Sequence, residues 1–250
     1  MKWIQRRVDQ VVVILPFEAE LYRRAGVPCT FVGHPLLDAV APHYDRGTLR
    51  AGFRLDPHGR VIGLLPGSRI GEVRALLPTI LDAAAGLARK EPKTQFILAQ
   101  ASTIQDNLLQ SLLRDSPVPV TVVKEQASEV MAASDLVLVA SGTATLQAAV
   151  VGTPMVLLYR TTMLTYWLAR ALIRVKWIGL VNLVANRSVV PELIQEEATG
   201  TRACEEALRI LEDRATYDEM KRSLAKVKDA LGEPGASIRA AEVVVAACRA

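Results

Sequence analysis

The chain has 250 residues, of which 50% are apolar, 5% aromatic and 22% charged, with a formal net charge of +4. This composition excludes a disordered chain, and the length suffices for one large domain or two of ordinary size. Three widely separated cysteines without a CxxC pair argue against a disulfide framework and a zinc site, and favour a reducing compartment. We find no export signal and no stretch of about 18 uncharged apolar residues, so we expect no membrane-spanning helix.

Short apolar runs alternate with longer segments of helical periodicity, which is the pattern of an α/β fold with a parallel sheet covered by helices. The predicted strands are Val11–Leu15, Thr30–Val32, Val61–Leu65, Gln95–Ala99, Val118–Val123, Leu136–Ala140 and Met155–Tyr159. The predicted helices between them include Glu72–Arg89, Thr103–Arg114, Ser128–Ala133 and Ala144–Val150. After Pro191 the sequence becomes charged, with predicted helices at Glu205–Leu211, Tyr217–Leu231 and Ser237–Cys248.

Glycine and proline are concentrated between His34 and Gly59, which predicts a linker at residues 39–59. Residues 1–38 hold too few strands for a doubly wound domain and are predicted to be a remnant of one. Residues 60–200 are predicted to form one complete Rossmann-like domain. Residues 201–250 are predicted to be a helical tail that packs back toward the N-terminal half or toward a partner.

Ligands of open α/β sheets bind at the carboxyl ends of the strands, so ligand-binding residues are expected in the loops after the predicted strands. The first informative loop is Pro66-Gly67-Ser68-Arg69, between a strand and a helix. Gly67 permits close backbone approach, Ser68 can cap the helix, and Arg69 adds a forked cation, a combination that suits an anion. An ordinary turn with a solvated arginine is the alternative.

The second informative loop is Ser141-Gly142-Thr143-Ala144-Thr145, which again follows a strand and precedes a helix. Small hydroxyl side chains surround its glycine and leave room for a phosphate at the helix N-terminus. A tight helix start capped by Ser141 or Thr143 is the alternative. Two such loops on neighbouring strand ends are what a diphosphate requires, and together they favour an anion site over two ordinary turns.

Several familiar motifs are missing from the sequence. GxxxxGK[ST] and GxGxxG do not occur, which argues against a P-loop and against the usual dinucleotide fingerprint. Asp-x-Asp is also absent, and the three histidines, His34, His43 and His58, lie in or beside the breaker-rich segment. We therefore expect no metal and no cofactor. Arg69 and helix N-termini would then meet the charge of a diphosphate.

Between Asp135 and Glu192 the chain has five basic and no acidic residues. Part of this segment has helical periodicity, with arginines beside tryptophans on an apolar helix, which favours an anionic membrane surface over a nucleic acid. A buried helix with snorkelling arginines is the alternative. The predicted lipid-contacting residues are Leu164, Trp167, Leu168, Arg170, Arg174 and Trp177.

These stretches resemble lipid-A-disaccharide synthase, a membrane-associated glycosyltransferase of the two-Rossmann (GT-B) type. The matching stretches span nearly the whole chain and are Ile14–Glu18, Phe31–Leu36, Leu65–Arg69 with Glu72-Val73, Ala140–Leu146, Gly152–Val156 with Tyr159-Arg160, and Val189–Gln195. The resemblance implies a GT-B fold, here with one complete Rossmann-like domain, a remnant of the N-terminal one and a helical C-terminal tail.

The resemblance implies transfer of 2,3-diacylglucosamine from its UDP derivative to 2,3-diacylglucosamine 1-phosphate. The products would be the β(1→6) lipid A disaccharide phosphate and UDP, formed with inversion and without a metal. It also implies a cytoplasmic protein, peripheral on the inner face of the cytoplasmic membrane, and suggests a homodimer with exchanged C-terminal helices. Arg69 is the expected catalytic residue. The residues expected to bind the UDP-sugar are Gly67, Ser68, Arg69, Glu72, Ser141, Gly142, Thr143, Ala144, Thr145, Gln147 and Asn182.

Three departures from the family pattern are visible. Gln147 stands where the family usually has a glutamate suited to the ribose hydroxyls, and Val181-Asn182 stands where it has Pro-Asn. The N-terminal Rossmann half, with the aspartate proposed as general base, has no counterpart before Lys2-Trp3. We therefore expect the donor-binding part of the enzyme, and the absent aspartate argues against activity of this chain alone. The alternatives are a non-catalytic UDP-sugar or lipid-binding module, or another GT-B enzyme that uses UDP-N-acetylglucosamine, such as the peptidoglycan transferase or the 2-epimerase.

Overall fold

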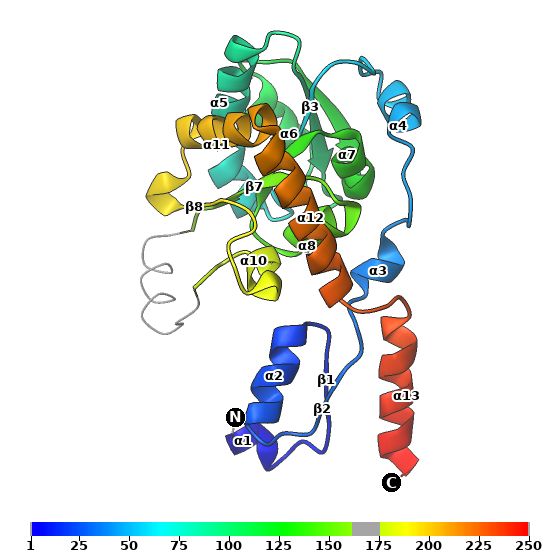
Figure 1. The fold of residues 1–250 in the computed structure, drawn as a ribbon. Coiled ribbons are helices and arrows are strands. Elements are labelled where there is room, and N and C mark those ends of the chain that lie inside the picture. The colour runs from blue at the N-terminus through cyan, green and yellow to red at the C-terminus, as the bar shows by residue number, and fades with distance from the viewer. Residues whose placement is uncertain (1, 162–175, 250) are drawn as a thin grey trace.

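A computed structural model describes residues 2–161 and 176–249 of the chain. Figure 1 shows a helix-covered sheet in the upper part of the molecule and a small N-terminal unit below it, with the last helix beside that unit. No helix within the described residues is long and apolar enough to cross a membrane.

The larger part of the molecule is built on a six-stranded sheet in which every pairing is parallel. Its strands are β3 (Val61–Leu65), β4 (Gln95–Gln100), β5 (Val120–Lys124), β6 (Leu136–Ala140), β7 (Met155–Tyr159) and β8 (Glu192–Ile194). They are ordered β5-β4-β3-β6-β7-β8, the order of a Rossmann-like sheet that begins at β3. The two central strands, β3 and β6, are buried along their whole length, as expected for a sheet covered on both faces. The predicted parallel sheet is thereby confirmed.

Helices cover this sheet on both faces (Figure 1). Those between the strands are α5 (Ile70–Lys90), α6 (Asp106–Leu113), α7 (Ala127–Ala133), α8 (Thr143–Val151) and α10 (Leu180–Ala185), and the short 3-10 helix Gln195–Glu197 follows β8. Two C-terminal helices, α11 (Gly200–Glu212) and α12 (Arg214–Ala230), belong to the same body because α11 packs against α5 and α12 against α8. The apolar side of α11, with Ala203, Ala207 and Ile210, is buried there.

The N-terminal unit contains α1 (Lys2–Gln5), β1 (Val11–Val13), α2 (Pro16–Arg24) and β2 (Cys29–Phe31), with β1 parallel to β2. The last helix, α13 (Ala236–Arg249), lies beside this unit (Figure 1). The tail at 201–250 is therefore divided, because α11 and α12 cover the sheet whereas α13 reaches the N-terminal unit. Arg239 of α13 donates from Nε to the carbonyl oxygen of Val32 over 2.9 Å.

The segment 39–59, expected to be a linker, is held firmly against the larger domain. It contains α4 (Arg46–Gly52). Asp45 caps this helix, because its side chain accepts a hydrogen bond from the backbone N–H of Thr48. A shorter helix, α3 (Leu36–Ala39), precedes it. Sequence analysis missed α4 because Gly47 and Gly52, counted as breakers, lie within it.

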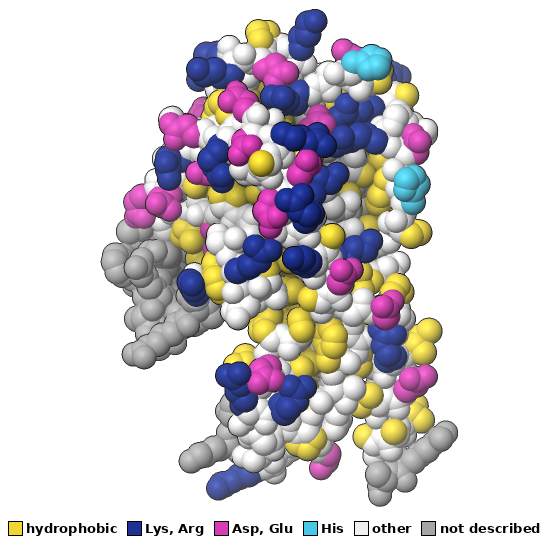
Figure 2. All heavy atoms as spheres, in the orientation of Figure 1, with side chains coloured by type: hydrophobic (Ala, Val, Ile, Leu, Met, Phe, Trp, Pro, Cys, Tyr) yellow, Lys and Arg dark blue, Asp and Glu magenta, His cyan; other side chains and the backbone are white. Residues whose placement is uncertain are grey.

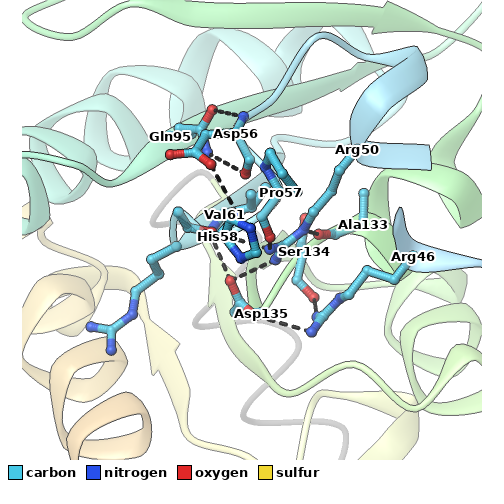
Figure 3. Close-up of polar contacts among 12 residues, drawn as sticks. Arg46, Arg50, Asp56, Pro57, His58, Val61, Gln95, Ala133, Ser134 and Asp135 are labelled. Carbon is cyan, nitrogen blue, oxygen red and sulfur yellow. Dashed lines mark hydrogen bonds and ion pairs between the residues drawn. The ribbon is translucent and has the colours of Figure 1, made fainter. Parts of the chain in front are cut away.

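Arg50 attaches α4 to the sheet domain (Figure 3). Its Nη2 lies 2.8 Å from Oδ2 of Asp135, and the rest of the guanidinium donates to the carbonyl oxygens of Ala133, Pro57 and Gly59. Asp135 Oδ2 also accepts the backbone N–H of Val61, the first residue of β3. This cluster therefore lies at the amino-terminal edge of the central strands.

Candidate functional site

An open cleft of about 740 Å³ lies at the carboxyl-terminal ends of the sheet strands. Its lining comes from the last residues of β3, β4 and β6, from the segments that follow β3, β4, β5 and β6, and from Ala39 of α3. The strand order reverses direction between β3 and β6, and this switch point is where open α/β sheets bind ligands. The two loops singled out in the sequence thus do lie on neighbouring strands and face one cleft.

The loop after β3 presents a glycine, a serine and an arginine to the cleft. Gly67 has a φ of +111°, which a residue with a side chain rarely adopts. The expected capping by Ser68 is wrong, because the residue before α5 is Arg69, whose backbone N–H donates to the side chain of Glu72. The Ser68 carbonyl instead accepts the hydroxyl of Thr103, which joins this loop to the one after β4.

The loop after β6 is open toward the cleft. Gly142 has a φ of +148°, and a Cβ built on it would meet no atom within 4 Å. It is the residue that precedes α8, and no side-chain hydrogen bond caps that helix. The hydroxyls of Ser68, Ser141 and Thr143 make no hydrogen bond within the described part of the chain. These hydroxyls and the amides of two helix N-termini are thus available to an anionic ligand.

Gln147 lines the same cleft from the second turn of α8. Its Nε2 donates to Oγ of Ser128 over 2.7 Å, and Ser128 belongs to α7. The Gln147 amide therefore connects α8 to α7, and its Oε1 has no hydrogen-bond partner among the described residues.

Part of the cleft wall was missed by sequence reasoning. It is formed by the last residue of β4 and by residues after β4 and β5, and these are Gln100, Ala101, Ser102, Glu125, Ala127, Ser128 and Glu129. The two loops carry no glycine-rich or basic motif, so no local signal distinguished them. Their position at the carboxyl ends of predicted parallel strands was the available signal.

The charge of the lining is unbalanced. Of the described lining residues, Arg69 is the single Lys or Arg, whereas Glu72, Glu125 and Glu129 are acidic. The Arg69 side chain is 82% exposed, and its Nη1 lies 2.6 Å from Oε1 of Glu72. The one cation of the described wall is therefore already paired with a carboxylate.

Two residues expected in the UDP-sugar site lie inside the protein instead. Thr145 is buried, and its hydroxyl donates to the Gly142 carbonyl over 2.8 Å, so it shapes the loop from within. Asn182 is also buried and does not line the cleft. Its Oδ1 accepts the N–H groups of Val189 and Val190, and its Nδ2 lies 2.8 Å from Oε1 of Glu192. These bonds hold the turn that precedes β8. The other expected residues, from Gly67 to Gln147, all line the cleft, and Ala144 is among them.

Most residues predicted to contact lipid, namely Leu164, Trp167, Leu168, Arg170 and Arg174, lie outside the described residues. Trp177 is described, and Lys176 Nζ lies 4.8 Å from the centre of its ring. On the face that carries α11 and α12, Figure 2 shows basic and acidic side chains interspersed. Within the ranges that the structure describes, no group of three or more His, Cys, Asp and Glu side chains is placed to hold a metal ion.

Solved structures share this fold at low sequence identity. The chain is similar to UDP-GlcNAc 2-epimerase from Neisseria meningitidis, with a TM-score of 0.64 and 15% identity over 95% of this chain and 61% of the other. It is also similar to sucrose-phosphate synthase from Thermosynechococcus elongatus, with a TM-score of 0.60 and 14% identity over 99% and 60% of the two chains. These likenesses define the class as an α/β domain of the GT-B fold.

A sequence model described as lipid-A-disaccharide synthetase matches residues 1–246. The chain therefore belongs to the lipid-A-disaccharide synthetase family. It is 45% identical to the lipid-A-disaccharide synthase of Geobacter sulfurreducens over 98% of its own length, and 41% identical to that of Nitrosococcus oceani over 96%. It spans 64% and 62% of the length of these two relatives. The family resemblance found in the sequence is thus confirmed.

Proposed function

We propose that the cleft binds the UDP part of a UDP-sugar, and that the chain is the donor-binding part of a lipid A glycosyltransferase. The observation that carries this proposal is the convergence of two strand-to-helix loops, with free hydroxyls and one exposed arginine, at the β3–β6 switch point. Membership of the family supports it. So does the UDP-GlcNAc bound to the epimerase from Neisseria meningitidis, whose fold this chain shares.

In the proposed reaction, 2,3-diacylglucosamine passes from its UDP derivative to 2,3-diacylglucosamine 1-phosphate. The acceptor hydroxyl attacks the anomeric carbon from the face opposite UDP, so the configuration inverts, and the glycosidic bond forms as the bond to UDP breaks. The hydroxyl proton passes to a general base, the role that the family resemblance gives to an aspartate of the N-terminal Rossmann half. Negative charge develops on the departing diphosphate, and preorganised donors directed at this charge lower the barrier. Arg69, the hydroxyls of Ser141 and Thr143, and the first amides of α5 and α8 are proposed to supply these donors.

UDP binding by the chain tests the site directly. We expect calorimetry to show UDP binding that is weakened at least about tenfold in Arg69→Ala, because a charge-assisted hydrogen bond is lost. Arg74→Ala is the matched control, since Arg74 is an exposed arginine of α5, the helix that Arg69 precedes, forms no ion pair in the described chain and does not line the cleft. It should bind UDP like the parent chain. Equal affinity in Arg69→Ala and the parent would contradict the role of Arg69.

Because no metal or other cofactor is expected, EDTA should leave the UDP affinity unchanged.

The choice of sugar is tested by product analysis on the whole enzyme of a close relative into which this chain's segment has been exchanged. Turnover of an acylated donor, with no turnover of UDP-N-acetylglucosamine, is the expected result. Turnover of the non-acylated donor would instead favour another GT-B enzyme. UDP binding without transfer to any acceptor would favour a non-catalytic binding module.

The acylated substrates require a lipid surface, and the basic segment before Trp177 is proposed to contact it from the cytoplasmic side. Replacement of both Arg170 and Arg174 by glutamate should reduce co-sedimentation of the protein with anionic vesicles. Unchanged co-sedimentation would contradict this contact.

A homodimer that exchanges C-terminal helices is also proposed. The homodimer is tested by measuring the molar mass in solution. A truncation before α13 should shift the mass toward that of the monomer.

A further inference from the structure

The side chain of Glu72 lies inside the loop that is proposed to hold the diphosphate. Its Oε1 is 2.6 Å from Arg69 Nη1, and its Oε2 is 3.4 Å from the backbone nitrogen of Arg69. A Cβ built on Gly67 would come within 2.7 Å of Glu72 Oε2, so the carboxylate packs against the glycine backbone itself. Glu72 is 23% exposed, whereas Arg69 is 82% exposed. A negative group thus already occupies the anion loop.

Glu72 engages the same groups that a phosphate would need. It is the third residue of α5, where a carboxylate interacts favourably with the partial positive charge of the helix N-terminus. It also holds the guanidinium of Arg69, the one Lys or Arg among the described lining residues. Because the guanidinium can satisfy few anions at once, a diphosphate at this loop must share Arg69 with Glu72 or separate the two.

The surroundings give no second cation to offset this competition. Glu125 and Glu129 add two further carboxylates to the described wall. Neither has an ion-pair partner within the described residues, so Glu72 differs from both by its direct contact with Arg69. Removing the charge of Glu72 should therefore change the affinity for an anion more than removing either of the others.

We propose that Glu72 is an internal competitor of the nucleotide diphosphate. It holds Arg69 in the empty site, gives the arginine up when the diphosphate binds, and takes it back when the diphosphate leaves. This inference rests on the proposed function of the cleft. It gives Glu72 a positioning role, in which the carboxylate opposes binding of the ligand instead of contributing to it. Its consequence is weaker retention and faster release of UDP.

The test uses Glu72→Gln, which removes the charge but keeps a side chain that can accept the N–H of Arg69, as glutamine does at this position of helix N-termini. Glu129→Gln is the matched control, because it removes the same charge from the same cleft without a contact to Arg69. Calorimetry and stopped-flow dissociation are measured with UDP and with uridine, in the parent chain and both variants.

We expect Glu72→Gln to bind UDP about five- to tenfold more tightly, mainly through slower dissociation, since a like charge within a few ångström of a phosphate is removed. Uridine affinity should not change, and Glu129→Gln should alter UDP affinity less than about twofold. In an Arg69→Ala background the gain from Glu72→Gln should fall by more than half, because the contested partner is gone.

The possible outcomes distinguish the competitor role of Glu72 from the UDP site itself. UDP binding that is equal or weaker in Glu72→Gln than in the parent chain overturns the competitor role and leaves the UDP site standing. An equal gain in Glu129→Gln also overturns it, since general charge would then explain the effect. Failure of the parent chain and both variants to bind UDP overturns the proposed function and this inference together.

Discussion

The two edges of the central sheet use arginine in opposite ways. At the amino-terminal edge, the Arg50 side chain is 7% exposed and donates to three backbone carbonyls and to Asp135 (Figure 3). At the carboxyl-terminal edge, the Arg69 side chain is 82% exposed, and its partner is Glu72, three residues further along in the first turn of α5. An arginine whose donors are all directed at the protein serves the fold. An arginine with one local partner keeps donors for a ligand.

The largest effect is expected from Arg50→Ala, which should lower the free energy of unfolding by about 3 kcal/mol, since removing one partner of a buried pair leaves the other uncompensated. Asp135 keeps Arg46, 3.1 Å away, so the loss should stay near the lower end for such pairs. Urea denaturation followed by circular dichroism measures it. The matched variant is Arg46→Ala. Because the Arg46 side chain is 45% exposed, its removal should lower the free energy of unfolding by at most about 1 kcal/mol. Equal losses in the two variants would contradict the distinction between the buried and the exposed arginine.

The second effect depends on pH and concerns His34, a buried side chain at the place where the chain passes from the N-terminal unit to the sheet domain. Burial lowers the pKa of His34 from its ordinary value of 6.5, and its Nδ1 accepts the N–H of Leu36. As the pH falls below 6.5, the unfolded chain takes up this proton before the folded chain does. The stability contributed by neutral His34 is therefore complete above pH 6.5 and is lost as the pH falls through the folded pKa.

This pH effect is measured as the difference in unfolding free energy between pH 7 and pH 5. His34→Gln should show a smaller difference than the parent chain. His58→Gln, a change at an exposed histidine, should not alter it. An unchanged pH dependence in His34→Gln would argue that the imidazole titrates alike in the folded and unfolded chains.

The smallest effect on stability is expected from Arg69→Ala. Its one ion pair within the described residues is exposed and joins two residues three apart at the start of a helix, so the free energy of unfolding should change by less than about 0.5 kcal/mol. The same denaturation experiment measures it. A loss comparable with that of Arg50→Ala would mean that Arg69 supports the fold, and the contrast between the two edges would fail.

Much of the sheet was readable from the sequence, because β3, β6 and β7 are continuous apolar runs whose predicted bounds equal the observed ones. β8 was missed, since Glu192–Ile194 is short and is defined by pairing with the distant strand β7. The attachment of α4 to the sheet domain could not be predicted either, because it depends on Arg50 and Asp135, which lie 85 residues apart in sequence. Local patterns carry no information on such contacts.

The cleft shows the same limit. The residues of the β3 and β6 loops were predicted correctly as neighbours, because glycine, hydroxyl and arginine residues at strand ends have a local meaning. Asn182 was assigned to the ligand although its four hydrogen-bonding contacts are internal, and only the folded turn before β8 reveals them. The walls after β4 and β5 follow from sheet order and not from any motif.

The chain passes between the N-terminal unit and the sheet domain twice, after β2 and again before α13. At this crossing the N–H of His34 donates to the carbonyl of Leu231 over 2.9 Å, and the N–H of Gly235 donates to Asp38 over 2.6 Å. The two covalent connections are thus bonded side by side and form one mechanical joint. A force on either half is transmitted through this joint, through the close contact of Gly33 with Gly232, and through the packing of α2 against α10.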